Sequence, residues 1–165
     1  MNILVTVGSM QGRSFSRLFQ IIDELCDEGI LSNDTIIAQT GYDKYESKFY
    51  KTFDLTSDEE FKELIKKSDV IISHAGTGTV TSCLKQHKKV ILFPRLSKYN
   101  EHYDDHQIEL CEFFQMNNYV LVAKDKKELV NCLRKVRDFQ PEEFQSNKES
   151  FNRLILKALE GWNLN

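Results

Sequence analysis

Short apolar runs and amphipathic stretches alternate along the whole chain. Most of the runs are continuously apolar, which is typical of strands that are buried on both faces of a parallel sheet. The runs that we predict to be β-strands are Ile3–Val7, Thr35–Gln39, Tyr50–Leu55, Asp69–Ser73, Val90–Phe93 and Tyr119–Val122.

Between these runs, apolar side chains recur with the i, i+3, i+4 and i+7 spacing of amphipathic helices. Ser57 followed by Glu60 forms a capping box, which marks the start of one of them. Helices are predicted around the stripe Phe15, Leu18, Phe19, Ile22 and Leu25, around the stripe Phe61, Leu64 and Ile65, and over residues 79–87, 104–116 and 125–137.

Strands that alternate with helices form right-handed βαβ units, so the chain is predicted to be α/β with a doubly wound, mostly parallel sheet. Residues 1–140 make up this domain. Residues 141–165 are expected to form a C-terminal amphipathic helix that Pro141 opens and that packs on the domain or on a partner. Its apolar stripe consists of Phe151, Leu154, Ile155, Ala158, Leu159 and Trp162.

Composition narrows the class of protein. The 165 residues suit one domain at roughly 100–200 residues per domain. The 11 Phe and 6 Tyr argue against disorder, and no apolar run approaches the ~20 residues of a membrane span. The opening MNILVTVG has no basic region or cleavage site, so it is interpreted as a first strand rather than a signal peptide.

Charge and cysteine content point to a protein of reducing compartments without a global attraction to nucleic acid. The 22 basic and 25 acidic side chains leave a net charge of −3. The four cysteines contain no CxxC pair, and each lies in an apolar, helix-like stretch. We therefore interpret Cys26, Cys83, Cys111 and Cys132 as reduced core thiols of a cytoplasmic protein.

Candidate chemistry is sought directly after the strands, because open parallel sheets bind ligands beyond the carboxyl ends of their strands. The segments at these positions are Gly8–Gly12, Gln39–Gly41, His74–Thr79 and Pro94–Gln107.

The segment His74–Thr79 combines features of a phosphate site. Gly76 and Gly78 lack a Cβ, which lets a ligand approach the backbone. Thr77 and Thr79 offer hydroxyls, and the free N–H groups of the helix that follows attract an anion. The alternative interpretation is a tight strand-to-helix connection in which glycine is needed only because a larger side chain would not fit.

Common nucleotide motifs are incomplete at this turn. A Walker A loop needs a lysine that does not follow Gly78, which disfavours an ATPase or GTPase. The GxGxxG fingerprint lacks its third glycine, and no acidic residue ends the second strand, which disfavours an NAD enzyme. No Asp-x-Asp triplet indicates a metal-held nucleotide sugar.

A second polar cluster follows the fifth strand. His102 and His106 lie four residues apart, but no third ligand supports a zinc site. Asp104 or Asp105 is expected to cap the following helix, whose first turn then presents His106 and Gln107 to the hydroxyls of a sugar. Further members of the cluster are Arg95 and Lys98, whereas His87 belongs to a solvated, lysine-rich turn.

The motifs VTVGS, QTG, SDVIISHAGTGT, FPR and DDHQIE together resemble the C-terminal domain of family-28 glycosyltransferases. The similarity runs from residue 1 to about residue 123 and is greatest to the small soluble subunits of two-part UDP-sugar transferases. One such enzyme adds the second GlcNAc to a dolichol-linked precursor. The PRxxxYxEHxDDHQ pattern from Pro94 to Gln107 looks most like the branch that assembles bacterial exopolysaccharide and capsule.

This resemblance implies a GT-B half-domain that binds a UDP-sugar without metal or other cofactor. Gly8 and Ser9 would line the donor cleft, His106 and Gln107 would reach the sugar, and His74 is the one candidate catalytic group. A relative places a ribose-binding glutamate at the position of Ser82, which departs from that pattern. The full set of expected substrate-binding residues is Gly8, Ser9, His74, Ala75, Gly76, Thr77, Gly78, Thr79, Arg95, Asp105, His106 and Gln107.

The resemblance also implies a partner, because a GT-B enzyme has two halves and this chain supplies one. The acceptor half is expected from a membrane-anchored subunit that holds a lipid-linked acceptor and keeps this chain at the inner face of the membrane. The expected activity is inverting hexosyl or N-acetylhexosaminyl transfer from the UDP-sugar. The alternative is a non-catalytic accessory subunit that stabilises a separate glycosyltransferase.

Overall fold

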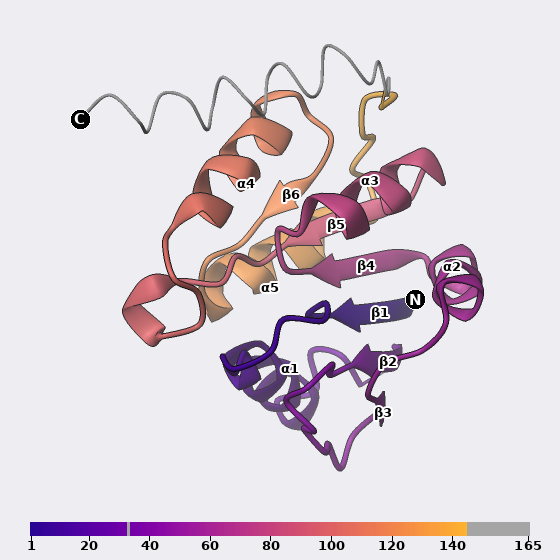
Figure 1. The fold of residues 1–165 in the computed structure, drawn as a ribbon. Coiled ribbons are helices and arrows are strands. Elements are labelled where there is room, and N and C mark those ends of the chain that lie inside the picture. The colour runs from indigo at the N-terminus through magenta and orange to yellow at the C-terminus, as the bar shows by residue number, and fades with distance from the viewer. Residues whose placement is uncertain (33, 145–165) are drawn as a thin grey trace.

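The computed structural model describes residues 1–32 and 34–144. Its centre is a six-stranded sheet in the order β3-β2-β1-β4-β5-β6, in which every neighbouring pair runs parallel. The predicted α/β fold with a doubly wound parallel sheet is thereby confirmed (Figure 1). The strands are β1 (Asn2–Thr6), β2 (Thr35–Gln39), β3 (Lys51–Phe53), β4 (Val70–Ser73), β5 (Lys89–Leu92) and β6 (Leu121–Val122).

The two edge strands are shorter than their apolar runs. The run Tyr50–Leu55 yields only β3, and the run Tyr119–Val122 yields only the two residues of β6. Each of these strands pairs with a single neighbour, so its regular geometry ends where that neighbour's hydrogen bonds end. Apolar character marks burial here and does not by itself fix strand length.

The predicted helices are also confirmed, with ends that move by a few residues. The helix expected over 79–87 begins two residues earlier, because Gly76 occupies the N-cap position. The capping box of Ser57 and Glu60 is present at the start of α2. The bounds are α1 (Ser16–Asp27), α2 (Asp58–Lys67), α3 (Thr77–Lys85), α4 (His106–Met116) and α5 (Lys126–Lys135), with a short 3₁₀ turn at Ser97–Tyr99.

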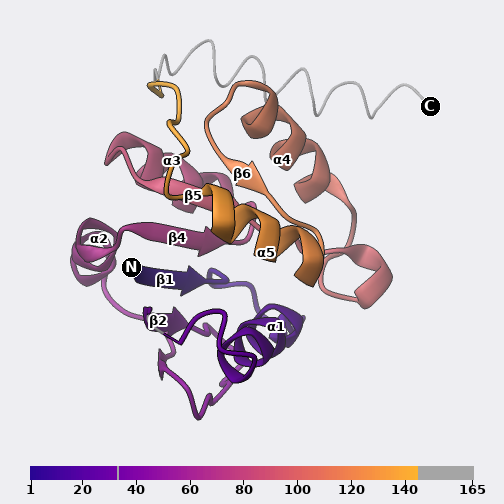
Figure 2. The same cartoon turned by 180° about the vertical axis from the view of Figure 1, so that it is seen from behind.

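Helices cover both faces of the sheet. Helices α1 and α5 lie on one face, and α2, α3 and α4 lie on the other, as the two opposite views show (Figures 1 and 2). Side chains of β1 alternate between the faces: Ile3 and Val5 join the core under α1 and α5, whereas Leu4 joins the other core. Both faces are therefore buried, as the continuous apolar runs predict.

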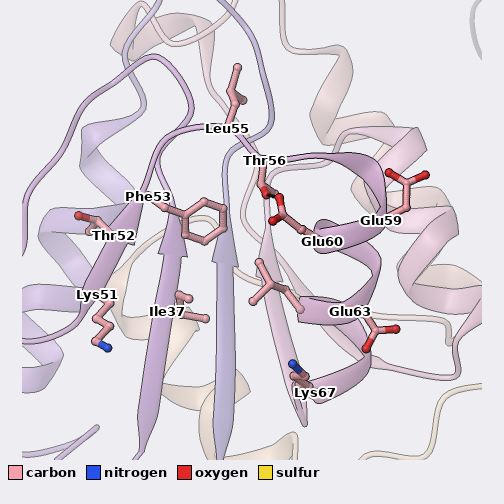
Figure 3. Close-up of a pocket in the computed structure, with 11 residues that line it drawn as sticks. Ile37, Lys51, Thr52, Phe53, Leu55, Thr56, Glu59, Glu60, Glu63 and Lys67 are labelled. Carbon is pink, nitrogen blue, oxygen red and sulfur yellow. Dashed lines mark hydrogen bonds between the residues drawn. The ribbon is translucent and has the colours of Figure 1, made fainter.

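One part of the sheet lacks a helical cover among the described residues. The connection between β2 and β3 packs on the α1 face, where the Tyr45 ring stacks on Phe19 with centroids 5.1 Å apart. On the opposite face, β2, β3 and α2 enclose an open groove of about 740 Å³, into which Phe53 and Ile37 project (Figure 3). In consequence Leu64 of α2 is only half-buried, whereas the neighbouring Ile65 is fully buried.

The thiols are reduced, as predicted: all four cysteines are free, three of them buried and Cys26 half-buried. No helix within residues 1–32 and 34–144 is long and apolar enough to cross a membrane. The expected C-terminal helix over 141–165 lies almost entirely outside the described residues, and residues 141–144 are not helical.

Candidate functional site

The strand order reverses between β1 and β4, which places the switch point of the sheet between them. The two strands are in register, with Thr6 opposite Ser73, so they end side by side at one edge (Figure 1). Gly8 follows β1 and His74 follows β4. The residues expected from the sequence to meet a ligand are thus brought together at the crevice where such sheets bind nucleotides.

The His74 ring fills the space between two glycines. A Cβ added to Gly8 would lie 2.6 Å from His74 Cε1, and a Cβ added to Gly76 would collide with His74 Nε2. Gly8 also has a φ of +72°, in the left-handed region that favours glycine. The sequence-based reason for Gly76, open space for a ligand, is therefore corrected: the imidazole occupies that space.

His74 is uncharged at neutral pH. Its pKa is lowered to about 4, chiefly by burial and next by the nearby Arg95 cation, against an opposing effect of the Thr6 carbonyl. Its Nδ1 atom is fully buried and has no hydrogen-bond partner in the described part of the chain. A neutral imidazole in this position offers one N–H donor and one acceptor rather than a positive charge.

Gly78 differs from Gly76 because its missing side chain leaves open space. No atom lies within 4 Å of a Cβ added there, and the residue is exposed in the first turn of α3. Thr77 and Thr79 on either side are half-buried, whereas Ala75 packs inside the core with 1% of its surface exposed. Ligand access to the turn is therefore centred on residues 77–79.

The first turn of α3, like those of α1 and α4, has no side-chain N-cap, whereas those of α2 and α5 have one. Ser57 caps α2 and Asp125 caps α5, each by accepting a hydrogen bond from a first-turn N–H group. Gly76, the N-cap of α3, makes no such bond. The first N–H groups of a helix have no partner within the helix, so α3 presents bare donors and the positive end of its dipole at the switch point.

The loop between β5 and α4 shows the opposite arrangement. Its successive backbone N–H groups each donate to a side chain that lies further along the chain. Arg95 N donates to Gln107 Oε1 at 2.9 Å, Leu96 N to Glu101 Oε2 at 2.9 Å, and Ser97 N to Asp105 Oδ1 at 2.9 Å. The hydrogen bond from Ser97 N is the main cause of the lowered pKa of the Asp105 carboxyl.

Arg95 lies inside the protein, with 1% of its surface exposed. Its guanidinium donates to the carbonyls of Val7, Arg13 and Glu101 at 3.0–3.3 Å, and it lies 4.7 Å from the Phe15 ring centroid. Gln107 is likewise buried, and its carbonyl oxygen is used by Arg95 N. The structure therefore places both residues in the wall of the site rather than on its surface.

His106 begins α4 and remains half-buried at the edge of the site. Its ring stacks on His102 with centroids 6.4 Å apart, and His102 Nδ1 lies 2.9 Å from Asp104 Oδ1. Asp104, not Asp105, accepts a hydrogen bond from His106 N at 3.1 Å. Within the described ranges, no three or more His, Cys, Asp or Glu side chains are grouped as a metal site would need.

Sequence reasoning missed the residues that hold this edge together. Arg17 of α1 forms a two-pronged ion pair with Glu101, with N–O distances of 2.7 and 2.8 Å. Arg13 contacts the same loop: its guanidinium bonds to Asn100 and lies 4.0 Å from the Tyr103 ring centroid. The only sequence signal for Glu101 is its place inside the PRxxxYxEH pattern.

The groove beside α2 is separate from this edge cluster. Its rim carries Glu59 and Glu63 on one side and Lys51 on the other, and none of the expected site residues lines it (Figure 3).

Comparison with known proteins identifies the family of this chain. A model of the "Glycosyltransferase family 28 C-terminal domain" matches residues 2–159. This chain belongs to that family. The curated relatives of this family-28 domain include "UDP-N-acetylglucosamine transferase subunit ALG13" of Cryptococcus neoformans var. neoformans serotype D (strain JEC21 / ATCC MYA-565). It is 31% identical over 107 residues, which cover 62% of this chain and 52% of that protein.

The chain also aligns, over more residues, with a bacterial transferase. The "UDP-N-acetylglucosamine--N-acetylmuramyl-(pentapeptide) pyrophosphoryl-undecaprenol N-acetylglucosamine transferase 3" of Bacillus thuringiensis (strain Al Hakam) is 29% identical over 141 residues. The alignment covers 86% of this chain and 35% of that enzyme. The chain thus spans about half the length, or less, of the curated relatives it matches.

Solved structures support the fold. An NMR solution structure of ALG13 matches with a TM-score of 0.63 and 24% identity, covering 93% of this chain and 94% of that one. The structure of Os79 from O. sativa in complex with UDP matches with a TM-score of 0.60 and 15% identity, covering 95% and 35% of the two chains. The expected membership in the GT-B half-domain class is confirmed by these neighbours.

Proposed function

We propose that this chain is the donor-binding, catalytic subunit of an inverting glycosyltransferase that moves a sugar from UDP to a lipid-linked acceptor. The observation that carries the proposal is the uncapped first turn of α3, which lies at the switch point with open space over Gly78. Bare N–H donors and the positive end of a helix dipole attract anions, and the phosphates of a nucleotide are ligands of this kind.

The proposed mechanism follows from charge. As the bond between sugar and UDP breaks, negative charge grows on the departing diphosphate. N–H groups already fixed around it bind the transition state more tightly than the ground state. Loss of one such donor is expected to cost about 2.7–4 kcal/mol of barrier, by analogy with an oxyanion hole. The neutral His74 adds one N–H donor without needing a charge.

Gly8, Ser9 and His106 complete the proposed donor site. Gly8 lies against His74, Ser9 is exposed beyond β1, and His106 is the half-buried first residue of α4. Ala75, Arg95, Asp105 and Gln107 support the walls in this proposal, because each of their side chains is packed or hydrogen-bonded within the protein. The proposal needs no metal.

A second, membrane-anchored subunit is proposed to supply the acceptor and the other wall of the cleft. The relatives named as subunits support this arrangement. The PRxxxYxEHxDDHQ pattern supports a use in bacterial polysaccharide assembly, and the names of the relatives support N-acetylglucosamine as the first sugar to test.

Calorimetric titration with UDP tests the proposal, with NAD as the competing ligand class. We expect UDP to bind to the full chain and NAD not to bind. Gly78→Ala should weaken UDP binding about tenfold, because the new methyl group occupies the approach to the backbone. The same change should raise the free energy of unfolding by roughly 0.5–1 kcal/mol, since alanine favours a helix over glycine.

Thr81→Ala is the matched control for this substitution. Thr81 lies in the same helix, and its hydroxyl bonds only to the carbonyls of Thr77 and Gly78. It should leave UDP affinity unchanged. A chain that binds no UDP, or a Gly78→Ala variant that binds it as tightly as the wild type, would contradict the proposed site.

A further inference from the structure

The carboxylate of Glu101 accepts hydrogen bonds from two elements beside the candidate site, α1 and the loop after β5. It is buried, with 3% of its residue surface exposed. Oε1 accepts from Arg17 Nε at 2.7 Å, and Oε2 accepts from Arg17 Nη2 at 2.8 Å and from Leu96 N at 2.9 Å. A buried charge is tolerated when it is paired and its remaining lone pairs are used, and Glu101 meets both conditions.

Arg17 extends this contact to three separate elements. It belongs to α1, and its other N–H groups donate to the carbonyls of Pro94, at the end of β5, and Lys124, after β6, both at 3.1 Å. The guanidinium also lies 4.6 Å from the Phe93 ring centroid. The ion pair therefore joins the carboxyl ends of β5 and β6 to α1.

The backbone carbonyl of Glu101 connects this ion pair to the loop after β1. It accepts from Arg95 Nη1, whose guanidinium also holds the loop after β1 through the carbonyls of Val7 and Arg13. The next residue is His102, whose ring stacks on His106. One residue thus fixes both the loop that follows β1 and the start of α4.

We infer that Glu101 is a positioning residue for the sugar part of the donor, an inference that rests on the proposed function. Its ion pair with Arg17 sets where His106 and the start of α4 lie relative to the glycine turn. The diphosphate is bound by α3, which Glu101 does not touch. Glu101 therefore controls recognition of the sugar and leaves recognition of UDP unchanged.

The test compares affinities for UDP and for UDP-sugars on the full chain. The wild type is first titrated with UDP-GlcNAc, UDP-glucose, UDP-galactose and UDP-glucuronate, and the tightest of these is kept as the probe. We expect Glu101→Gln to lower affinity for that probe at least tenfold and to change UDP affinity about twofold or less. Exchange of the Leu96 amide proton should accelerate, while exchange in α3 stays unchanged.

Glu112→Gln is the matched control, since Glu112 lies on α4 in an exposed, 3.9 Å contact with Lys124. It should change neither affinity. If Glu101→Gln does not fold, Arg17→Lys keeps the charge, removes the two-pronged geometry and should show the same selective loss. Equal loss of both ligands, or no loss of either, would overturn the inference. A wild-type chain that binds none of the nucleotides would instead overturn the proposed function, and the inference with it.

Discussion

The two segments that border the switch point treat their backbone donors in opposite ways. At the start of α3, no side chain caps the N–H groups, and the space over Gly78 is open. Between β5 and α4, the N–H groups of Arg95, Leu96 and Ser97 each donate to a side chain of the same loop or of the first turn of α4. The start of α3 therefore keeps N–H donors available for a ligand, whereas the loop between β5 and α4 is held in place by its own hydrogen bonds.

This difference separates binding from positioning. A free N–H group at a helix start costs stability until an anion supplies its hydrogen bond, so it is expected where a ligand binds. A satisfied N–H group has nothing left to offer a ligand and instead fixes its neighbours. We call the segment between β5 and α4 the filled loop and the start of α3 the bare turn. The contrast predicts that substitutions in the filled loop act on stability and on recognition of the sugar, whereas the Gly78 substitution at the bare turn acts on affinity for UDP.

The largest expected effect is on the filled loop. Arg95→Ala leaves the buried carbonyls of Val7 and Glu101 without this donor and opens a cavity beside Phe15. We expect the free energy of unfolding to fall by about 3–5 kcal/mol, measured by urea denaturation. Arg134→Ala, at an exposed position of α5, should change it by about 0.5 kcal/mol or less. A loss as small as that of Arg134→Ala would show that the loop does not depend on the Arg95 cation.

The second effect is a pH dependence at the bare turn. The folded-state pKa of His74 is lowered to about 4, below the value of about 6.5 expected in the unfolded chain. The unfolded state therefore binds the proton first, and stability is lost as the pH falls from about 6.5 to about 4. The full loss due to this one group is roughly 3 kcal/mol.

His74→Gln isolates that contribution, since glutamine has no proton to gain in this range. We expect the wild type to lose roughly 3 kcal/mol more than His74→Gln between about pH 7 and about pH 4, measured by denaturation at each pH. His87→Gln, at an exposed position, should follow the wild-type curve. Identical curves for all three proteins would mean that folding does not lower the pKa of His74.

The smallest expected effect is that of Asp105→Asn on affinity for UDP. Asp105→Asn keeps an oxygen that accepts the Ser97 N–H and removes an exposed negative charge. We expect UDP affinity to change about twofold or less, because exposed charges contribute little and the residue does not face α3. A large loss of UDP binding in the same titration would place Asp105 in the diphosphate site and blur the division between the two segments.

Much of the architecture follows from local sequence patterns. Continuous apolar runs predicted the buried parallel strands, and the pair Ser57 and Glu60 predicted the start of α2. The order of strands and helices predicted the doubly wound sheet, and the position of His74–Thr79 directly after a strand placed it at the carboxyl edge. These features depend on residues that are close together in the chain, so the sequence alone determined them.

Only the tertiary structure decided which polar groups remain free. Gly76 seemed open to a ligand from its sequence, but the His74 ring fills its space while Gly78 stays accessible. Arg17 and Glu101 are 84 residues apart, and no local pattern reveals that they pair. Hydrogen bonds and packing of this kind depend on which elements the whole fold brings together. The sequence thus determined where the candidate site lies, and the fold decided which of its polar groups are left without a partner within the protein.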